Sequence, residues 1–221
     1  ALDPDGLGPR GFGRPRLLVS TYVQDGLHIP AQKTRGIGAD PSLAWDRSGG
    51  LHNGRVYVVW TQWPKNTART NIMFQYSDDN GTTWSEAVQL SDDHAVSSQF
   101  FPAIAVDQAT GDVAVSWYKS GSTGGMPNGD TQIWAAFSVD GGVRFAPNFR
   151  VSKGTSNAND ANSFFDYGDY SGAAFQSHRF YPGWADNSDS TGTNPNGARH
   201  DLDLYTALVF IPPDGPASIS P

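Results

Sequence analysis

The chain has 221 residues, with 21 Asp against one Glu and 11 Arg against four Lys. Asp, together with 25 Gly and 15 Pro, favours turns, whereas Glu and Lys favour helices. This composition disfavours a helical bundle and an α/β fold, and it indicates short strands joined by turns. The net charge of −7 disfavours nucleic acid as a partner. No run approaches the roughly 18 apolar residues of a membrane span. Without Cys there is no disulfide and no thiol nucleophile.

In chain order, the pattern divides the chain into five segments. Residues 1–36 read as the end of a preceding repeat unit, with an outer strand at residues 16–20. Two complete units follow at 37–96 and 97–160, a weaker third unit spans 161–212, and 213–221 form a tail. The predicted strands of the three units are residues 41–46, 56–60, 72–77 and 87–90, then 102–107, 113–117, 133–138 and 148–151, then 170–175, 180–184 and 203–207.

The first two complete units repeat at a constant offset of 61 residues. Pro41 corresponds to Pro102, and Ile72 corresponds to Ile133. Four strands in every 50 to 60 residues are typical of a β-propeller blade. A β-sandwich with regularly spaced turns is the alternative, and the constant offset disfavours it. The sequence therefore predicts an all-β fold of about three and a half four-stranded blades.

A turn motif recurs between the third and fourth strands of both complete units. It reads Ser-x-Asp-x-Gly-x-x-aromatic, and its residues are Ser77, Asp79, Gly81 and Trp84, then Ser138, Asp140, Gly142 and Phe145. An Asp carboxylate can accept backbone N–H bonds across such a turn, and Gly can adopt positive φ. The aromatic ring can fold back onto the blade. We expect these eight residues to be structural.

These turns resemble the Asp-box, or BNR repeat, of the sialidase-like β-propellers, over about residues 37–212. The resemblance implies that the boxes close hairpins at the rim, away from the central pocket. Enzymes of that family grip a substrate carboxylate with three Arg and use a Tyr nucleophile activated by a Glu, with an Asp as acid/base. The only Glu here is Glu86, beside a box and on the outer edge of its blade. The resemblance leaves Arg179, Tyr181 and Asp186 as the catalytic candidates, because they flank the inner strands of the last unit.

Other chemistry has weaker sequence support. Asp166 and Asp169, three residues apart in one loop, could hold Ca²⁺ through oxygen ligands, although the spacing of a known calcium loop is absent. The His residues lack zinc-ligand spacing. No cofactor is otherwise expected. The aromatic candidates for stacking on a sugar ring are Trp63, Trp134, Tyr181 and Trp184.

A three-blade arc leaves open edges and open faces. We therefore expect the remaining propeller blades, or a partner chain, to complete it. The favoured function is a non-catalytic recognition or scaffold part of an Asp-box propeller that is secreted or on the cell surface and binds a glycan or a protein. The alternative is the C-terminal part of an exo-sialidase-type glycoside hydrolase.

Overall fold

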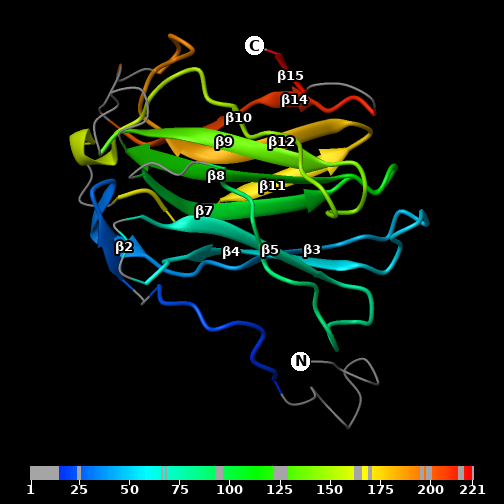
Figure 1. The fold of residues 1–221 in the computed structure, drawn as a ribbon. Coiled ribbons are helices and arrows are strands. Elements are labelled where there is room, and N and C mark those ends of the chain that lie inside the picture. The colour runs from blue at the N-terminus through cyan, green and yellow to red at the C-terminus, as the bar shows by residue number, and fades with distance from the viewer. Residues whose placement is uncertain are drawn as a thin grey trace, which may run out of the picture.

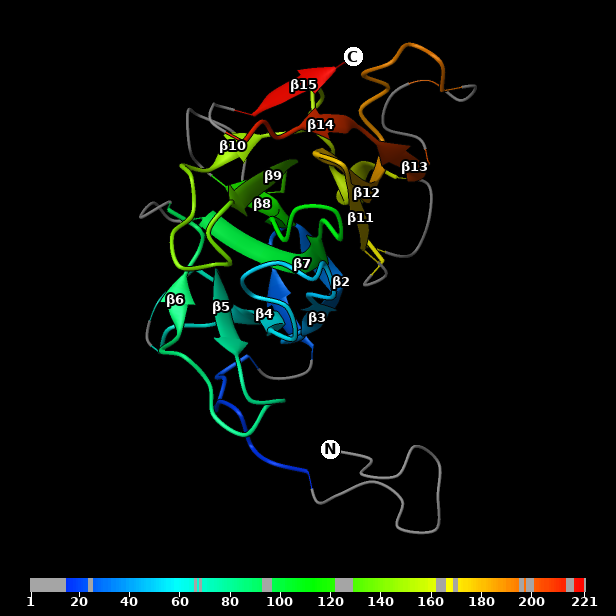
Figure 2. The same ribbon diagram turned by 90° about the vertical axis from the view of Figure 1, so that its right-hand side faces the viewer.

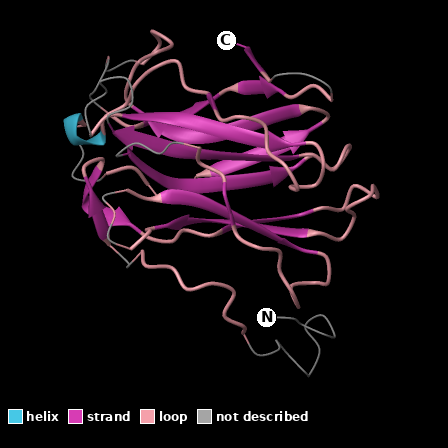
Figure 3. Cartoon of the chain, viewed as in Figure 1, coloured by secondary structure: helices cyan, strands magenta, loops and turns pink. Residues whose placement is uncertain are grey.

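A computed structural model of the chain describes residues 15–23, 26–65, 67, 69–92, 97–121, 129–161, 166–168, 171–194, 197, 201–213 and 217–220. Strands dominate this part of the chain, and its helical segment is the short 3-10 helix η2 (Ala158–Asp160) (Figure 3). Among the described residues, no helix has the length and apolar character needed to cross a membrane.

The strands form one hairpin and three larger antiparallel sheets. The hairpin pairs β1 (Leu27–Ile29) with β2 (Gln32–Ile37). The first sheet has the order β3 (Ser42–Trp45), β4 (Val56–Gln62), β5 (Asn71–Ser77), β6 (Val88–Gln89). The second has the order β7 (Ser97–Val106), β8 (Val113–Gly121), β9 (Thr131–Ser138), β10 (Phe149–Arg150). The third contains β11 (Gly172–Gln176), β12 (Arg179–Asp186), β13 (Asp203–Thr206), β14 (Leu208–Phe210) and β15 (Ser218–Ser220).

The sequence repeat reappears in the backbone hydrogen bonds. The Leu90 amide donates to the Ile72 carbonyl at 2.8 Å, and the Val151 amide donates to the Ile133 carbonyl at 2.7 Å. Both residues of the first bond are shifted by 61 positions in the second. The offset therefore reflects the same strand pairing in two successive sheets.

The three sheets pack face to face in chain order. Figure 2 shows the first sheet at the bottom, the second in the middle and the third at the top. One cluster of buried apolar side chains joins the first and second sheets, and another joins the second and third sheets. All residues of β7 and β8 are buried, as expected for a sheet that is covered on both faces. The chain thus folds as a partial β-propeller of three successive antiparallel sheets (Figure 1).

Two sequence predictions about the ends were wrong. Residues 16–20 form no strand, although their apolar run suggested one. They run along the outer side of the first sheet, where no neighbouring strand offers backbone partners. The predicted tail 213–221 contains β15, which pairs with β14 through Ile219 and Val209. A three-residue strand after two prolines carries too little periodicity to be recognised in a sequence.

Trp117 tests how far stability depends on the packing between sheets. Its side chain is 2% exposed between the first and second sheets, and its indole N–H donates to Gln99 Oε1 at 2.6 Å. Replacing it with alanine should lower the free energy of unfolding by about 3–5 kcal/mol, because a cavity remains. Trp45, which is 52% exposed, is the matched control, and its change to alanine should cost less than about 1 kcal/mol. Urea denaturation of both variants measures the difference, and equal losses would contradict the expectation.

Candidate functional site

The first predicted Ser-x-Asp-x-Gly turn follows β5 and is held by its own side chains. Ser77 Oγ donates to Asp79 Oδ1 at 2.9 Å and accepts the Gly81 amide at 2.8 Å. Asp79 Oδ1 also accepts the Thr83 amide at 2.7 Å, and Asp79 Oδ2 accepts the Thr83 hydroxyl at 2.6 Å. The carboxylate therefore satisfies donors of its own turn.

The second turn, after β9, repeats this geometry. Ser138 Oγ donates to Asp140 Oδ1 at 2.8 Å and accepts the Gly142 amide at 2.8 Å. Arg144 stands where the first turn has Thr83. Its amide donates to Asp140 Oδ1 at 2.9 Å, and its Nε donates to Asp140 Oδ2 at 3.0 Å. The Arg side chain thus makes the same contact as the Thr hydroxyl that it replaces.

The second turn also fastens the first sheet to the second. Arg55, 7% exposed, donates to both carboxylate oxygens of Asp78 at 2.6 and 2.8 Å and to the Gly141 carbonyl at 2.7 Å. Burial opposes its charge, but the hydrogen bond and charge of Asp78 leave the pKa of Arg55 raised. Gly142 has φ +84°, and a Cβ there would lie 2.5 Å from Phe74 Cζ. This glycine is therefore required both by its backbone conformation and by the packing.

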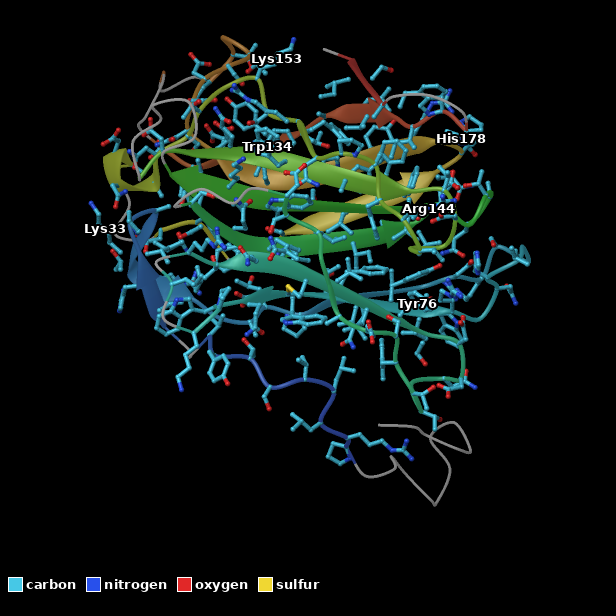
Figure 4. All side chains as sticks on the ribbon, in the orientation of Figure 1. Lys33, Tyr76, Trp134, Arg144, Lys153 and His178 are labelled. Atoms are coloured by element: carbon cyan, nitrogen blue, oxygen red, sulfur yellow. The ribbon has the colours of Figure 1, made fainter. Side chains whose placement is uncertain are left out.

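A cavity of about 330 Å³ lies at the opposite end of the sheets from these turns. β5 runs from Asn71 at the cavity end to Ser77 at the turn end. In Figure 4, Arg144 and Tyr76 mark the turn end, and Lys33 of the β1–β2 hairpin marks the other. The hairpin, the β4–β5 loop and the adjacent ends of β7 and β8 line the cavity; the lining residues are Leu27, His28, Ile29, Pro30, Trp63, Thr67, Arg69, Thr70, Ser98, Ser120 and Gly121.

The cavity combines an aromatic wall with hydroxyl and cationic groups. Trp63 is half-buried, and its indole N–H donates to the Thr67 carbonyl at 2.7 Å, which fixes the orientation of the ring. Arg69 and His28 supply nitrogen donors, and the described lining residues include no Asp or Glu. A mostly apolar cavity with a few placed polar groups is typical of a small-molecule site.

A second cavity of about 270 Å³ lies where the chain enters β3 and β11, beside β7. Asp40, Ser42, Phe101 and Ser171 are among its lining residues. Phe101 has φ +52° and lies at an irregularity in the β7–β8 pairing. The Asp40 carboxylate accepts the Gly38 amide at 3.0 Å. This cavity is more polar in character than the first and includes one acidic residue among its lining groups.

The structure does not bring the three predicted catalytic residues together. Side chains alternate along β12, so Arg179 and Tyr181 lie on the exposed face of the third sheet, whereas Asp186 is 2% exposed on the opposite face. The Asp186 carboxylate accepts the Trp184 indole N–H at 3.0 Å and the Ser188 amide at 2.6 Å. The two-residue period of the strand separates odd from even positions, so the three candidates do not share one face of the sheet.

The predicted calcium pair is only half described. Asp166 is buried, and its Oδ2 accepts the amides of Thr34 and Arg35 at 2.6 and 2.9 Å, which anchors β2. Asp169 lies outside the described residues. The hydrogen bonds of Asp166 assign it a structural role at the hairpin.

A group with metal-ligand chemistry is present elsewhere, in Asp107, Asp112 and His178, whose ligand atoms lie within 4.8 Å of one another. Asp107 accepts the amides of Ala109, Ser177 and His178 at 2.9, 2.9 and 2.6 Å. Although burial opposes ionisation, these bonds keep the pKa of Asp107 lowered. The carboxylate thus holds the β11–β12 turn against the end of β7.

The sugar-stacking candidates fall in different surroundings. Trp63 lines the first cavity, Trp184 is buried between sheets, and Trp134 lies under the Lys119 ammonium at 4.1 Å. Tyr181 is on the open face of the third sheet. Sequence reasoning missed Arg69 and His28. The nearest available signal was that Arg69, like Trp63, falls in the loop between two predicted strands.

The acid limb of the stability curve tests the role of Asp79. Hydrogen bonds from the Thr83 hydroxyl and amide lower the pKa of Asp79 from 3.8 to about 2. Because the folded-state pKa lies below the unfolded value, ionised Asp79 stabilises the fold above about pH 4, and this is lost as the pH falls through about 2. Asp79→Asn should flatten the dependence of Tm on pH in that window. Glu86→Gln, at an exposed site just past the same turn, is the control and should keep the wild-type dependence of Tm on pH. If Asp79→Asn also kept that dependence, the role assigned to Asp79 would be contradicted.

The sequence matches no protein-family model and no curated protein. Among solved structures, the fold is similar to a Hadza microbial sialidase at 14% identity and a TM-score of 0.48, covering 81% of this chain and 36% of that protein. It is also similar to the α-L-arabinanase of Penicillium chrysogenum, whose structure holds arabinobiose, at 13% identity and a TM-score of 0.46, covering 81% of this chain and 48% of that protein. The chain spans less than half the length of either protein, and neither likeness assigns an activity to it.

Proposed function

We propose that the chain is a non-catalytic, glycan-binding part of an Asp-box β-propeller that is secreted or on the cell surface. The glycan binds in the cavity beside Trp63. The extracellular location and the Asp-box family rest on the two Ser-x-Asp-x-Gly turns and their resemblance, and further sheets or a partner chain complete the arc.

The chemistry of the cavity beside Trp63 supports this proposal. A saccharide presents apolar C–H faces and a ring of hydroxyl groups. The Trp63 ring offers a flat apolar surface, and Thr67, Ser98, Ser120 and Arg69 offer hydrogen-bonding groups around it. A volume of about 330 Å³ suits one or two sugar rings.

The side chains that line the same cavity favour saccharide binding over hydrolysis. Most glycoside hydrolases need two carboxyl groups across the scissile bond, and sialidases need a Tyr activated by a carboxylate. The described lining residues include neither an acidic residue nor a Tyr. Glu86, the chain's single Glu, is exposed between β5 and β6, at the turn end of the sheet.

Trp63→Ala should weaken saccharide binding at least about tenfold, because the stacking surface is lost. Trp45→Ala removes an exposed Trp outside the cavity and should bind like the wild type. A saccharide array identifies the ligand, and isothermal titration then compares the three proteins, with thermal melts to show that each is folded. Equal affinity of Trp63→Ala and the wild type would refute the proposed site.

Incubation with a fluorogenic sialoside should give no turnover, because the described lining of the cavity beside Trp63 includes neither a carboxyl group nor a Tyr nucleophile. Turnover that survives purification would favour the hydrolase alternative and redirect attention to the second cavity, where Asp40 is the acidic lining residue. Asp40→Asn would then abolish the activity, whereas Trp63→Ala would leave the rate constant for turnover unchanged.

A further inference from the structure

The middle strands of the three sheets place equivalent residues on equivalent faces. Trp60, Trp117 and Trp184 occupy corresponding positions in β4, β8 and β12. Trp117 is buried against the first sheet and Trp184 against the second, so each faces the preceding sheet. On the opposite face, Tyr57 and its counterpart Ala114 are both fully buried against the following sheet.

The same rule identifies two faces that the described chain leaves without a partner sheet. Tyr181 is the counterpart of Tyr57 and Ala114, yet it is 41% exposed, because no described sheet follows the third. Leu204 and Phe210 pair with Ala185 and Arg179 of β12, so they lie on the same face of the third sheet as Tyr181. They are 84% and 39% exposed. We call this surface, formed by Tyr181, Leu204 and Phe210, the trailing face.

The other end of the arc presents the complementary surface. Trp60 points away from the second sheet, toward the side where a preceding sheet would stand, and Leu43 and Trp45 of β3 share that side through their pairing with Val58 and Val56. Leu43 and Trp45 are 61% and 52% exposed. We call this surface, formed by Leu43, Trp45 and Trp60, the leading face.

Residues 15–23 run along the side of the first sheet that faces away from the second (Figure 1). On this leading face, Trp60 is only 3% exposed. Two long hydrogen bonds join this segment to the sheet: Arg16 Nη1 donates to the Thr82 carbonyl at 3.4 Å, and Thr21 Oγ1 donates to the Thr61 carbonyl at 3.5 Å. Bonds near the outer limit of hydrogen-bond distance are weak, so residues 15–22 form a cover that another sheet can displace, while Val23 stays in the buried cluster with the β1–β2 hairpin.

We infer that the trailing face of one copy packs on the leading face of a second copy, with displacement of residues 15–22, so that two arcs close into one ring. The contact continues the rule by which the first sheet packs on the second and the second on the third. A two-fold pair forms the contact twice, which closes the assembly and leaves no repeated face for further growth. Two arcs of three sheets give six blades, within the range of about four to eight seen in propellers. This inference is independent of what the cavity beside Trp63 binds.

Analytical ultracentrifugation of the whole chain over a concentration series tests the inference. The wild type should show a monomer–dimer equilibrium without larger species. Tyr181→Glu and Leu43→Lys, one on each face, should each raise the dimer dissociation constant at least about tenfold, because each buries a charge in an apolar contact. Val143→Glu, at a 58% exposed apolar residue in the second turn, is the matched control and should dimerise like the wild type.

Mixing the two variants distinguishes this contact from one between two identical faces. In a mixed pair, one contact is wild type, and the other contains both substitutions, Tyr181→Glu and Leu43→Lys, whose introduced charges have opposite sign. The mixture should therefore dimerise more strongly than either variant alone. A monomeric wild type at all concentrations, dimers of undiminished affinity in Tyr181→Glu, or no recovery in the mixture would overturn the inference. Saccharide binding by a monomeric variant would leave the proposed function standing.

Discussion

Each of the three larger described sheets has two apolar faces, and the fold depends on covering both. Within the described residues, only the second sheet achieves this with two neighbouring sheets, and its strands β7 and β8 are buried throughout. The first sheet has one neighbouring sheet and the covering segment 15–22. The third has one neighbouring sheet and an exposed trailing face. Because apolar burial contributes about 25 cal/mol per Å², the uncovered faces are where an additional sheet would contribute most stability.

Polar groups determine how the stacked sheets are aligned. Arg55 links the first sheet to the second turn through the Gly141 carbonyl. Asp107 links the second sheet to the third through the amides of Ser177 and His178. Apolar faces alone would allow two sheets to slide, since the hydrophobic effect is not directional. A buried carboxylate or guanidinium must find its donors or acceptors in one position. Alignment of the sheets therefore accounts for Arg55 and Asp107, and no catalytic role is needed to explain them.

The strands were predictable from sequence because their signals are local. Alternating apolar residues and a turn motif repeated at 61 residues are visible without the structure, and the pairing of Ile72 with Leu90 and of Ile133 with Val151 follows them. The parity of Asp186 relative to Tyr181 was not available, because the predicted strand 180–184 stops before Asp186, whereas β12 runs from Arg179 to Asp186 and places the two residues on opposite faces. What the sequence could not show was the meeting of His28 with Arg69 at the first cavity, because that depends on where the β1–β2 hairpin lies against the sheets.

The two ends of the sheets are under different constraints. At the turn end, Gly142 has no room for a side chain against Phe74, and Asp79 and Asp140 are occupied by donors of their own turns. At the cavity end, Trp63 and Arg69 lie in the β4–β5 loop, eight and two residues before Asn71. The second sheet has a longer connection at the same place, before Thr131, so the 61-residue repeat does not fix the residues there. The loop side chains at that end are therefore not held by the repeated contacts that fix the two turns, although Trp63 packs against the buried cluster. A site that distinguishes ligands requires this freedom, and it is the reason to place recognition beside Trp63 and structural support in the turns.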